Sequence, residues 1–352
     1  KIPNTPVLLW EKYRGTEHPV PYQGRRYWTS ADGTEAFTDA NKLFDASSSE
    51  KPTDIFCYDQ DGNLYILWTD NFNYKVRRFE LKNGTSYATG VDSHALSTPS
   101  SPSYIAVDFS GWQNYLYCGY KDITNDWKVE RMSWIGNFAT LTTPHPIWSI
   151  TVGNAPGEEL TALAANKDGV FASVKETYQE VVSGVNNIDK YRLKVKKYKK
   201  ADGSLDSQIT LEDAVSYTDV TTGDPIADPN PGHDPDQACN QYQETINGLQ
   251  IANGMLYGIS SKLHRKWLMN VSHVWSPDVF KHSSILYKIG STTEALPNRP
   301  LAKKERPVDD TNKVGYGFYR FIAVKYDEAE RIRLIIASDS AWGDGVSSMN
   351  GD

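Results

Sequence analysis

Residues 261–282 bring together side chains that can bind a partner or a metal ion. Three of the seven histidines of the chain lie in this segment, with two tryptophans and an arginine. The candidate binding residues are His264, Arg265, Trp267, His273, Trp275 and His282. Trp and Arg are common anchors of interfaces, whereas histidines at positions 264, 273 and 282 match no familiar zinc spacing. The segment therefore predicts a long aromatic and histidine-rich loop that forms a binding surface. The alternative is a loop packed on its own aromatic side chains.

A second candidate is the acidic turn DQDGN at residues 59–63, where oxygen-bearing side chains alternate. Calcium loops use such alternation, but an EF-hand needs glycine at its sixth position, where Leu64 stands. A simple hairpin turn is therefore the preferred interpretation. The sequence has none of the short motifs of serine hydrolases, zinc proteases or nucleotide-binding loops. We assign no catalytic residue and no metal ligand, and we expect no cofactor apart from a divalent cation such as calcium.

The run KYRLKVKKYKK at residues 190–200 has seven basic residues. Such a run can form a patch that binds an anion, a phospholipid or a glycosaminoglycan. It is also typical of an exposed edge strand, which lysines keep from pairing with other chains. The acidic character of the whole chain favours the edge strand.

The composition limits the kind of partner that the chain can have. With 37 Lys and Arg against 44 Asp and Glu, the formal net charge is −7, which argues against binding nucleic acid through its phosphates. No apolar run approaches the roughly 20 residues of a membrane helix, so we expect no transmembrane segment. Three cysteines do not make a disulfide framework. Cys57 and Cys118 stand in apolar runs, as buried thiols do.

Five segments share one layout, in which two short apolar runs flank a turn rich in Asp, Gly or Asn. They are 55–68, 104–120, 160–174, 246–260 and 319–340. Turns of this kind between apolar runs are the strongest local signal for a β-hairpin. Helical periodicity is poor throughout, and β-branched and aromatic residues fill the runs, so the sequence predicts an all-β fold.

A third strand follows most of these hairpins and also repeats. Its copies are KVRRFE (75–80), KVERMS (128–133), KVKKYK (194–199) and ILYKIG (285–290). The second position is Val or Leu, the fourth is basic, and the fifth is apolar. Apolar residues three apart do not follow the alternation of a half-buried strand. A strand buried on both faces between neighbouring sheets does not need that alternation.

These repeats resemble the β-propeller repeat proteins, in the broad sense of the YWTD and NHL families. The resemblance depends on the DGNLY-type hairpin and on the following strand of the KVRRFEL type, and it covers most of residues 54–340. It implies five or six four-stranded blades around a channel, with loops on one face that bind a ligand or a partner.

The chain is then a single β-propeller domain over residues 1–352. The N-terminal run PVLLWE (6–11) matches the third-strand pattern, so it can close the last blade, and residues 22–45 are either outer strands or a degenerate sixth blade. The Pro/Asp-rich stretch at about 210–245 is expected to be a loop insertion outside the core. The alternative is two β-sandwich domains that split near 215–245.

The expected function is that of a non-enzymatic binding protein, a monomer with a protein or glycan partner. We expect it outside the cytoplasm, in the periplasm, at the cell surface or secreted. This location rests on a start at Lys1 without Met, a composition rich in Tyr, Asn and Trp, and the lack of a cytosolic cofactor motif. The alternative is a propeller hydrolase or lyase that acts on a lactone or a sugar, with a divalent metal in the central channel.

Overall fold

The protein is built from β-strands that follow one another as antiparallel sheets. The computed structural model describes residues 8–340, with gaps at 14–24, 31–41, 45–49, 60–62, 71, 83–85, 88, 94, 97–99, 111–112, 135–144, 155, 183–184, 230–237, 270–274, 309–316 and 327–331. The strands are β1 (Leu8–Tyr13), β2 (Arg25–Ser30), β3 (Lys42–Phe44), β4 (Lys51–Tyr58), β5 (Leu64–Thr69), β6 (Tyr74–Phe79), β7 (Leu81–Lys82), β8 (Ser86–Tyr87), β9 (Val91–Asp92), β10 (Pro102–Ser110), β11 (Gln113–Lys121), β12 (Trp127–Trp134), β13 (His145–Gly153), β14 (Glu158–Asn166), β15 (Gly169–Val182), β16 (Val185–Tyr198), β17 (Leu205–Val215), β18 (Tyr217–Asp219), β19 (Cys239–Ala252), β20 (Met255–Met269), β21 (Trp275–Ser291), β22 (Ala302–Val308), β23 (Gly317–Tyr326) and β24 (Ile332–Ser340).

Apart from the short two-stranded sheet β7-β8, the described residues form six sheets that follow one another along the chain, and we number these six as blades. Blade 1 is β1-β2-β3, blade 2 is β4-β5-β6-β9, blade 3 is β10 to β13, blade 4 is β14 to β17, blade 5 is β18 to β22, and blade 6 is β23-β24. The inner strands of successive blades pack together, β4 on β10, β10 on β14, β14 on β19 and β19 on β23. This arrangement is a β-propeller, and the five hairpins predicted from the sequence supply the inner strand of each of blades 2 to 6 and the strand paired with it, which are β4-β5, β10-β11, β14-β15, β19-β20 and β23-β24.

Blades 2 to 5 carry buried apolar side chains on both faces of the sheet, and the clusters that join them lie between neighbouring blades. In β5, Tyr65 and Leu67 pack in a cluster shared with blade 3, whereas Leu64 and Ile66 pack on the opposite face. Equivalent clusters join blade 3 to blade 4 and blade 4 to blade 5. Successive side chains of a strand point to opposite faces, so a continuous apolar run is what a strand between two sheets requires.

The spacing of three in the third strands has the same cause. Val76 of β6 faces blade 3, and Phe79 packs on the opposite face of blade 2. The same division holds for Val129 and Met132 in β12 and for Val195 and Tyr198 in β16. An odd spacing along a strand places one apolar residue on each face, so the expectation of burial on both faces is confirmed.

In two of these strands, β12 and β16, the basic residue at the fourth position forms a hydrogen bond to the next blade. Arg131 Nη1 of blade 3 donates to the main-chain carbonyl of Lys200, in the β16–β17 turn of blade 4. Lys197 Nζ of blade 4 donates to the carbonyl of Glu294, which follows β21 of blade 5, at 2.8 Å. Both cations are buried. A hydrogen bond from a charged donor is among the stronger polar contacts, so each of these two bonds helps to hold neighbouring blades together.

The β16–β17 turn is fastened to blade 3 by further contacts. Lys200 Nζ binds the buried Asp108 carboxylate of β10, and Trp148 Nε1 donates to the Lys200 carbonyl at 2.9 Å. The Arg131 guanidinium also lies 3.7 Å from the centroid of the Tyr115 ring. The β16–β17 turn therefore joins blade 4 to blade 3 through polar contacts of Lys200, and we call this turn the clasp.

Every inner strand of blades 2 to 6 carries an irregularity of register against its hairpin partner. In blade 5 it falls between Ile246 and Gly248 of β19. The others fall at 52–56, 102–104, 160–162 and 321–323. A bulge bends a strand and increases its twist, which suits strands that splay outward from a common axis.

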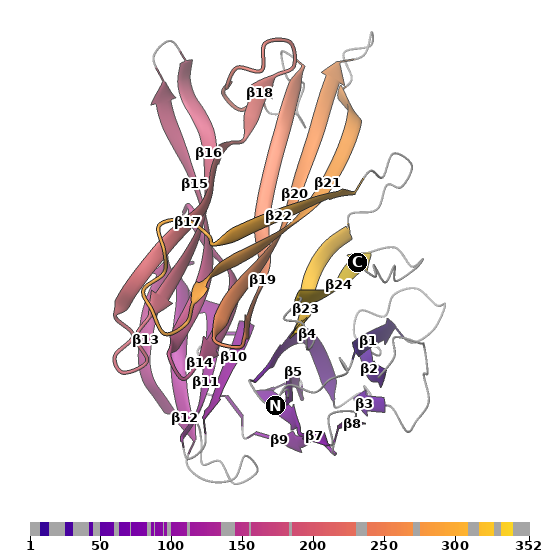
Figure 1. The fold of residues 1–352 in the computed structure, drawn as a ribbon, viewed down its shortest axis with the longest axis vertical. Coiled ribbons are helices and arrows are strands. Elements are labelled where there is room, and N and C mark those ends of the chain that lie inside the picture. Colours follow the sequence, from indigo (N-terminus) through magenta and orange to yellow (C-terminus); the bar gives the residue numbers. More distant parts are fainter. Residues whose placement is uncertain are drawn as a thin grey trace.

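Blades 4 and 5 extend far beyond the other blades. β15 and β16 have 14 residues each, and β20 and β21 have 15 and 17, against 6 in β5 and β6. Figure 1 shows two arms that rise on the same side of the molecule, β15–β16 of blade 4 and β20–β21 of blade 5, and β19 pairs with β20 along its whole length and is part of the second arm. The segment 261–282 is thus part of the second arm and not a loop, which corrects the expectation from sequence. Strand pairing there satisfies the backbone groups that a long loop would leave to water.

The expected insertion at 210–245 is narrower in the structure. β17 continues to Val215, β18 covers Tyr217–Asp219, and β19 begins at Cys239. Leu211 and Cys239 are buried, so the ends of the stretch do contribute to the core. One cluster joins blade 4 to blade 5 across this stretch, which excludes two separate β-sandwich domains divided there.

The N-terminal strand β1 pairs with β2, with Trp10 opposite Trp28, and heads a sheet of its own. Of the two interpretations of residues 22–45, the sixth blade agrees with this pairing, and the described strands do not show β1 paired with β24. Pairing with a neighbour in sequence closes a much shorter loop than pairing with the end of the chain, and it costs less entropy.

The clasp at the β16–β17 turn can be tested with two glycines. Gly203 has φ of +74°, and a Cβ there would lie 2.7 Å from Ile150 Cγ2, whereas Gly223 has φ of +78° with nothing within 4 Å of its Cβ. Alanine adds about 1–2 kcal/mol of backbone strain at either position. We expect Gly203→Ala to lower the free energy of unfolding by about 1–3 kcal/mol more than Gly223→Ala, because only Gly203 is overpacked. Urea denaturation measures both, and equal losses would contradict the docking of this turn on blade 3.

Candidate functional site

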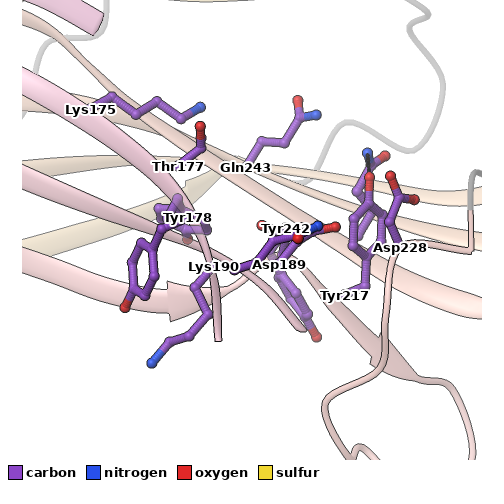
Figure 2. Close-up of a pocket in the computed structure, with 13 residues that line it drawn as sticks. Lys175, Thr177, Tyr178, Asp189, Lys190, Tyr217, Asp228, Tyr242 and Gln243 are labelled. Atoms are coloured by element: carbon purple, nitrogen blue, oxygen red, sulfur yellow. Dashed lines mark hydrogen bonds between the residues drawn. The ribbon is translucent and has the colours of Figure 1, made fainter. Parts of the chain in front are cut away.

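A pocket of about 290 Å³ opens between the arms of blades 4 and 5. Its lining residues are Lys175, Thr177, Tyr178, Gln179, Asp189, Lys190, Tyr191, Ser216, Tyr217, Asp228, Gln241, Tyr242 and Gln243. Figure 2 shows Lys175 and Thr177 toward one end of the pocket, Tyr217 and Asp228 at the other, and Tyr242 between them. The lining comes from β15 and β16 of blade 4 and from β19, β18 and the chain next to β18 on the side of blade 5, so only the packing of two blades creates it.

The Tyr242 ring is fixed by the strand beside it. Tyr242 of β19 lies opposite His264 of β20 in the register, and the two rings stack with centroids 4.7 Å apart and planes 14° apart. His264 Nε2 in turn lies 3.0 Å from Asn240 Oδ1. The pocket therefore has an aromatic wall that is already ordered before any ligand arrives.

Tyr217 is held by a chain of hydrogen bonds from the same sheet. Trp267 Nε1 donates to Gln241 Oε1 at 3.0 Å, and Gln241 Nε2 donates to the Tyr217 hydroxyl oxygen at 3.2 Å. Burial, and then the nearby Asp228 carboxylate, raise the pKa of Tyr217 to about 12. The phenol is therefore protonated at neutral pH and remains a hydrogen-bond donor.

The two lysines of the lining have different partners. Lys190 Nζ lies 2.9 Å from Glu180 and 3.5 Å from Asp213, and 5.7 Å from the centroid of the Tyr178 ring. Lys175 Nζ lies 3.4 Å from Thr245 Oγ1. Burial lowers the pKa of Lys175, and the Glu159 and Glu244 carboxylates oppose this shift.

A buried carboxyl group lies next to the pocket wall. Glu244 is 1% exposed, and its Oε1 accepts hydrogen bonds from Ser260 at 2.5 Å and from the Tyr287 hydroxyl at 3.1 Å. Its Oε2 has no hydrogen-bond partner among the described residues, although Lys262 Nζ lies 4.0 Å away. Burial raises the pKa of Glu244, with a smaller contribution from Glu212, against the effect of its donors and Lys262.

The structure brings two of the six predicted binding residues to this pocket. His264 supports Tyr242, and Trp267 supports Gln241, so both act through lining residues. Arg265 is half-buried on β20. Trp275 and His282 lie in β21, opposite Met269 and Leu263, and their side chains lie outside the described part of the structure, as does His273.

The tyrosines of the lining were not recognised in the sequence. Tyr178 and Tyr191 belong to blade 4, and Tyr217 and Tyr242 come from the chain that follows it. No short motif links them. The only signal was the aromatic content of 12% with 21 tyrosines, which does not say which tyrosines meet.

The basic run at 190–200 is neither an edge strand nor an open anion patch. β16 lies between β15 and β17, so the edge-strand interpretation is wrong. The four cations on one face of β16 pair with carboxylates of the same blade, namely Lys190 with Glu180 and Asp213, Arg192 with Glu176 and Asp213, Lys194 with Glu176, and Lys196 with Glu158. These pairs neutralise one face of the arm.

Asp59, the first residue of the acidic turn at 59–63, has a structural role. Asp59 Oδ1 accepts the Asn63 main-chain N–H at 3.0 Å, and Oδ2 accepts from Asn63 Nδ2 at 2.8 Å and from the Tyr65 hydroxyl at 3.0 Å. In the part of the chain that the structure describes, no three His, Cys, Asp or Glu side chains are grouped to hold a metal ion. Nor do the described residues form a helix long and apolar enough to cross a membrane.

Comparison with known proteins gives only distant likenesses. No protein-family model and no curated protein matches the sequence. An endo-arabinase from Bacteroides thetaiotaomicron VPI-5482 is 9% identical and aligns over 82% of this chain and 90% of its own, with a TM-score of 0.37. A glycosyl hydrolase from Bacteroides ovatus is 11% identical over 84% and 83% (TM-score 0.36), and extracellular domains 1–2 of Drosophila semaphorin 1b are 9% identical over 97% and 74% (TM-score 0.34). No functional conclusion follows from likenesses of this level.

The buried Glu244 predicts a pH dependence of stability. The ordinary pKa of the group is 4.5 and the folded value is higher, so the folded state binds the proton more tightly than the unfolded state. Its contribution is therefore most favourable below pH 4.5 and declines as the pH rises through the folded pKa. We expect Glu244→Gln to lose less stability than the wild type between pH 4.5 and pH 8.

Chemical denaturation across this pH range measures the effect. Glu305→Gln, at an exposed position, is the matched control and should follow the wild-type curve. Parallel curves for wild type and Glu244→Gln would show that the carboxyl group does not titrate in this way.

Proposed function

We propose that this β-propeller is a non-enzymatic binding protein whose ligand enters the pocket between the arms of blades 4 and 5. The observation that carries the proposal is the support of Tyr242 and Tyr217 by His264 and by the Gln241–Trp267 pair. Side chains ordered in advance reduce the entropy that a ligand must overcome on binding.

The residue types of the lining agree with recognition. Tyrosine combines a large rigid ring with a hydroxyl group and has only two side-chain torsions to immobilise. Amide and carboxylate side chains around it fix the orientation of a ligand through hydrogen bonds. These side chains recognise a ligand by packing and hydrogen bonds, and this recognition requires no chemical change in the ligand.

The alternative, a hydrolase or lyase with its site in the channel, has less support. Asp108 is a buried carboxylate of the inner strand β10, and Lys200 Nζ of the neighbouring blade binds it. Its charge therefore stabilises the contact between blades. We also propose that the protein acts outside the cytoplasm, on the strength of its Tyr-, Asn- and Trp-rich composition.

The test is a search for ligands that depend on the pocket. Purified protein is screened by thermal shift against a library of soluble oligosaccharides and a library of short peptides, and hits are titrated by calorimetry. We expect Tyr242→Ala to weaken the best ligand at least about tenfold, a loss of roughly 1.4 kcal/mol. Tyr74→Ala, at a half-buried tyrosine of blade 2, is the control and should leave the affinity unchanged. A ligand that binds both variants equally, or the lack of any hit, contradicts the proposal.

A further inference from the structure

We infer that the ligand of this pocket is a neutral saccharide, an inference that rests on the binding function proposed above. It follows from three properties of the lining, which are its charge balance, its mixture of donors and acceptors, and its lack of aliphatic side chains. Each property excludes a different class of ligand.

The charges of the lining cancel. Lys175 and Lys190 are opposed by Asp189 and Asp228, so two positive and two negative groups give a net charge of zero. Lys190 is further engaged by Glu180 and Asp213. An anion would meet two carboxylates and a cation would meet two ammonium groups, whereas an uncharged polar ligand meets no net repulsion.

The polar groups that face solvent offer both donors and acceptors. Thr177, Gln179, Asp228 and Gln243 are exposed in the lining. An amide side chain donates through its nitrogen and accepts through its oxygen, and a hydroxyl does both through one atom. Neighbouring hydroxyl groups of a sugar ring also donate and accept, so this mixture suits a polyhydroxylated molecule better than one with only acceptors.

The apolar surface of the pocket is aromatic. Its thirteen lining residues include four tyrosines and no Leu, Ile, Val, Met or Phe. A peptide gains affinity by placing aliphatic side chains in aliphatic pockets, which this lining does not provide. The C–H groups on one face of a sugar ring pack flat on an aromatic ring, and Tyr242, held against His264, is such a surface.

The size of the pocket fits one small unit of a larger chain. Its volume of about 290 Å³ lies at the lower limit of ligand pockets, which span roughly 300–1,000 Å³. The pocket opens between two long hairpins, so a longer glycan can continue along the arms from the sugar that the pocket holds.

Calorimetry with defined probes tests the inference. The probes are neutral tetrasaccharides of glucose, galactose, mannose and xylose, an anionic heparin tetrasaccharide and a pool of short peptides. We expect at least one neutral tetrasaccharide to bind, with an affinity that is the same in 0.05 M and 0.5 M NaCl, because salt screens only charged partners.

Variants locate the binding. Tyr242→Ala should lower the affinity for the neutral tetrasaccharide at least about tenfold, because packing on the ring is lost. Gln243→Ala, which changes only an exposed side chain, should lower it at least about threefold, because hydrogen bonds are lost. Tyr74→Ala is the control for both. Because Gln243 is exposed, its variant keeps the test valid even if Tyr242→Ala reduces stability.

The outcomes separate the two proposals. If only the heparin probe or only peptides bind, and Tyr242→Ala weakens them, the saccharide inference is wrong and the binding function stands. If no probe binds in a way that depends on Tyr242, both are wrong. Neutral tetrasaccharide binding that Gln243→Ala and Tyr242→Ala leave unchanged also overturns the inference, because the sugar then occupies another site.

Discussion

A sheet that is apolar on both faces is stable only where other sheets cover it, and this constraint governs the whole protein. Val76 and Phe79 on one strand, and Leu64 and Tyr65 on another, lie on opposite faces, so a blade that stood alone would expose both residues of each pair to water. The inner strands of blades 2 to 6 therefore pack in chain order, and the clusters between blades 2 and 3, 3 and 4, and 4 and 5 stabilise both members of each pair. The arms and the pocket between them depend on this packing, since the cluster of blades 4 and 5 continues directly beneath them.

Polar contacts add specificity to this apolar packing. Arg131 and Lys197 occupy the same position of the repeat and reach the same kind of acceptor, a main-chain carbonyl in the next blade. A buried cation is costly unless its donors are satisfied, so a blade placed at the wrong angle would leave that cation unpaired. At the contacts of blade 3 with blade 4 and of blade 4 with blade 5, this basic residue thus selects one arrangement of the two blades among those that would bury similar apolar area.

The sequence was most informative where structure is local. Turns of the DG and NG type and the Val-x-basic pattern are short-range signals, and they predicted the hairpins and their third strands. The sequence favours a loop at 261–282 because His264, Arg265 and Trp267 lie on a strand that is not buried on both faces, so they lack the apolar pattern of the inner hairpins. The pocket was beyond prediction for a different reason. Tyr178 and Tyr242 meet only after two blades have packed, and nothing near either residue in the sequence refers to the other.

The bulge in β19 shifts the alternation of side chains by one residue, so different positions face blade 4 in the two halves of this strand. Tyr242 and Ile246, at even positions, pack toward blade 4 before the bulge, and Leu249 and Ile251, at odd positions, do so after it. Residues after the bulge are fixed by their packing against blade 4. Which face of the arm turns toward blade 4 depends on the extra residue in the bulge. Removing one residue there would turn the arm over relative to the ring, because a shift of one exchanges the faces of a strand. Length changes at this point thus offer evolution a way to present a second set of side chains to the pocket while the ring keeps its sequence.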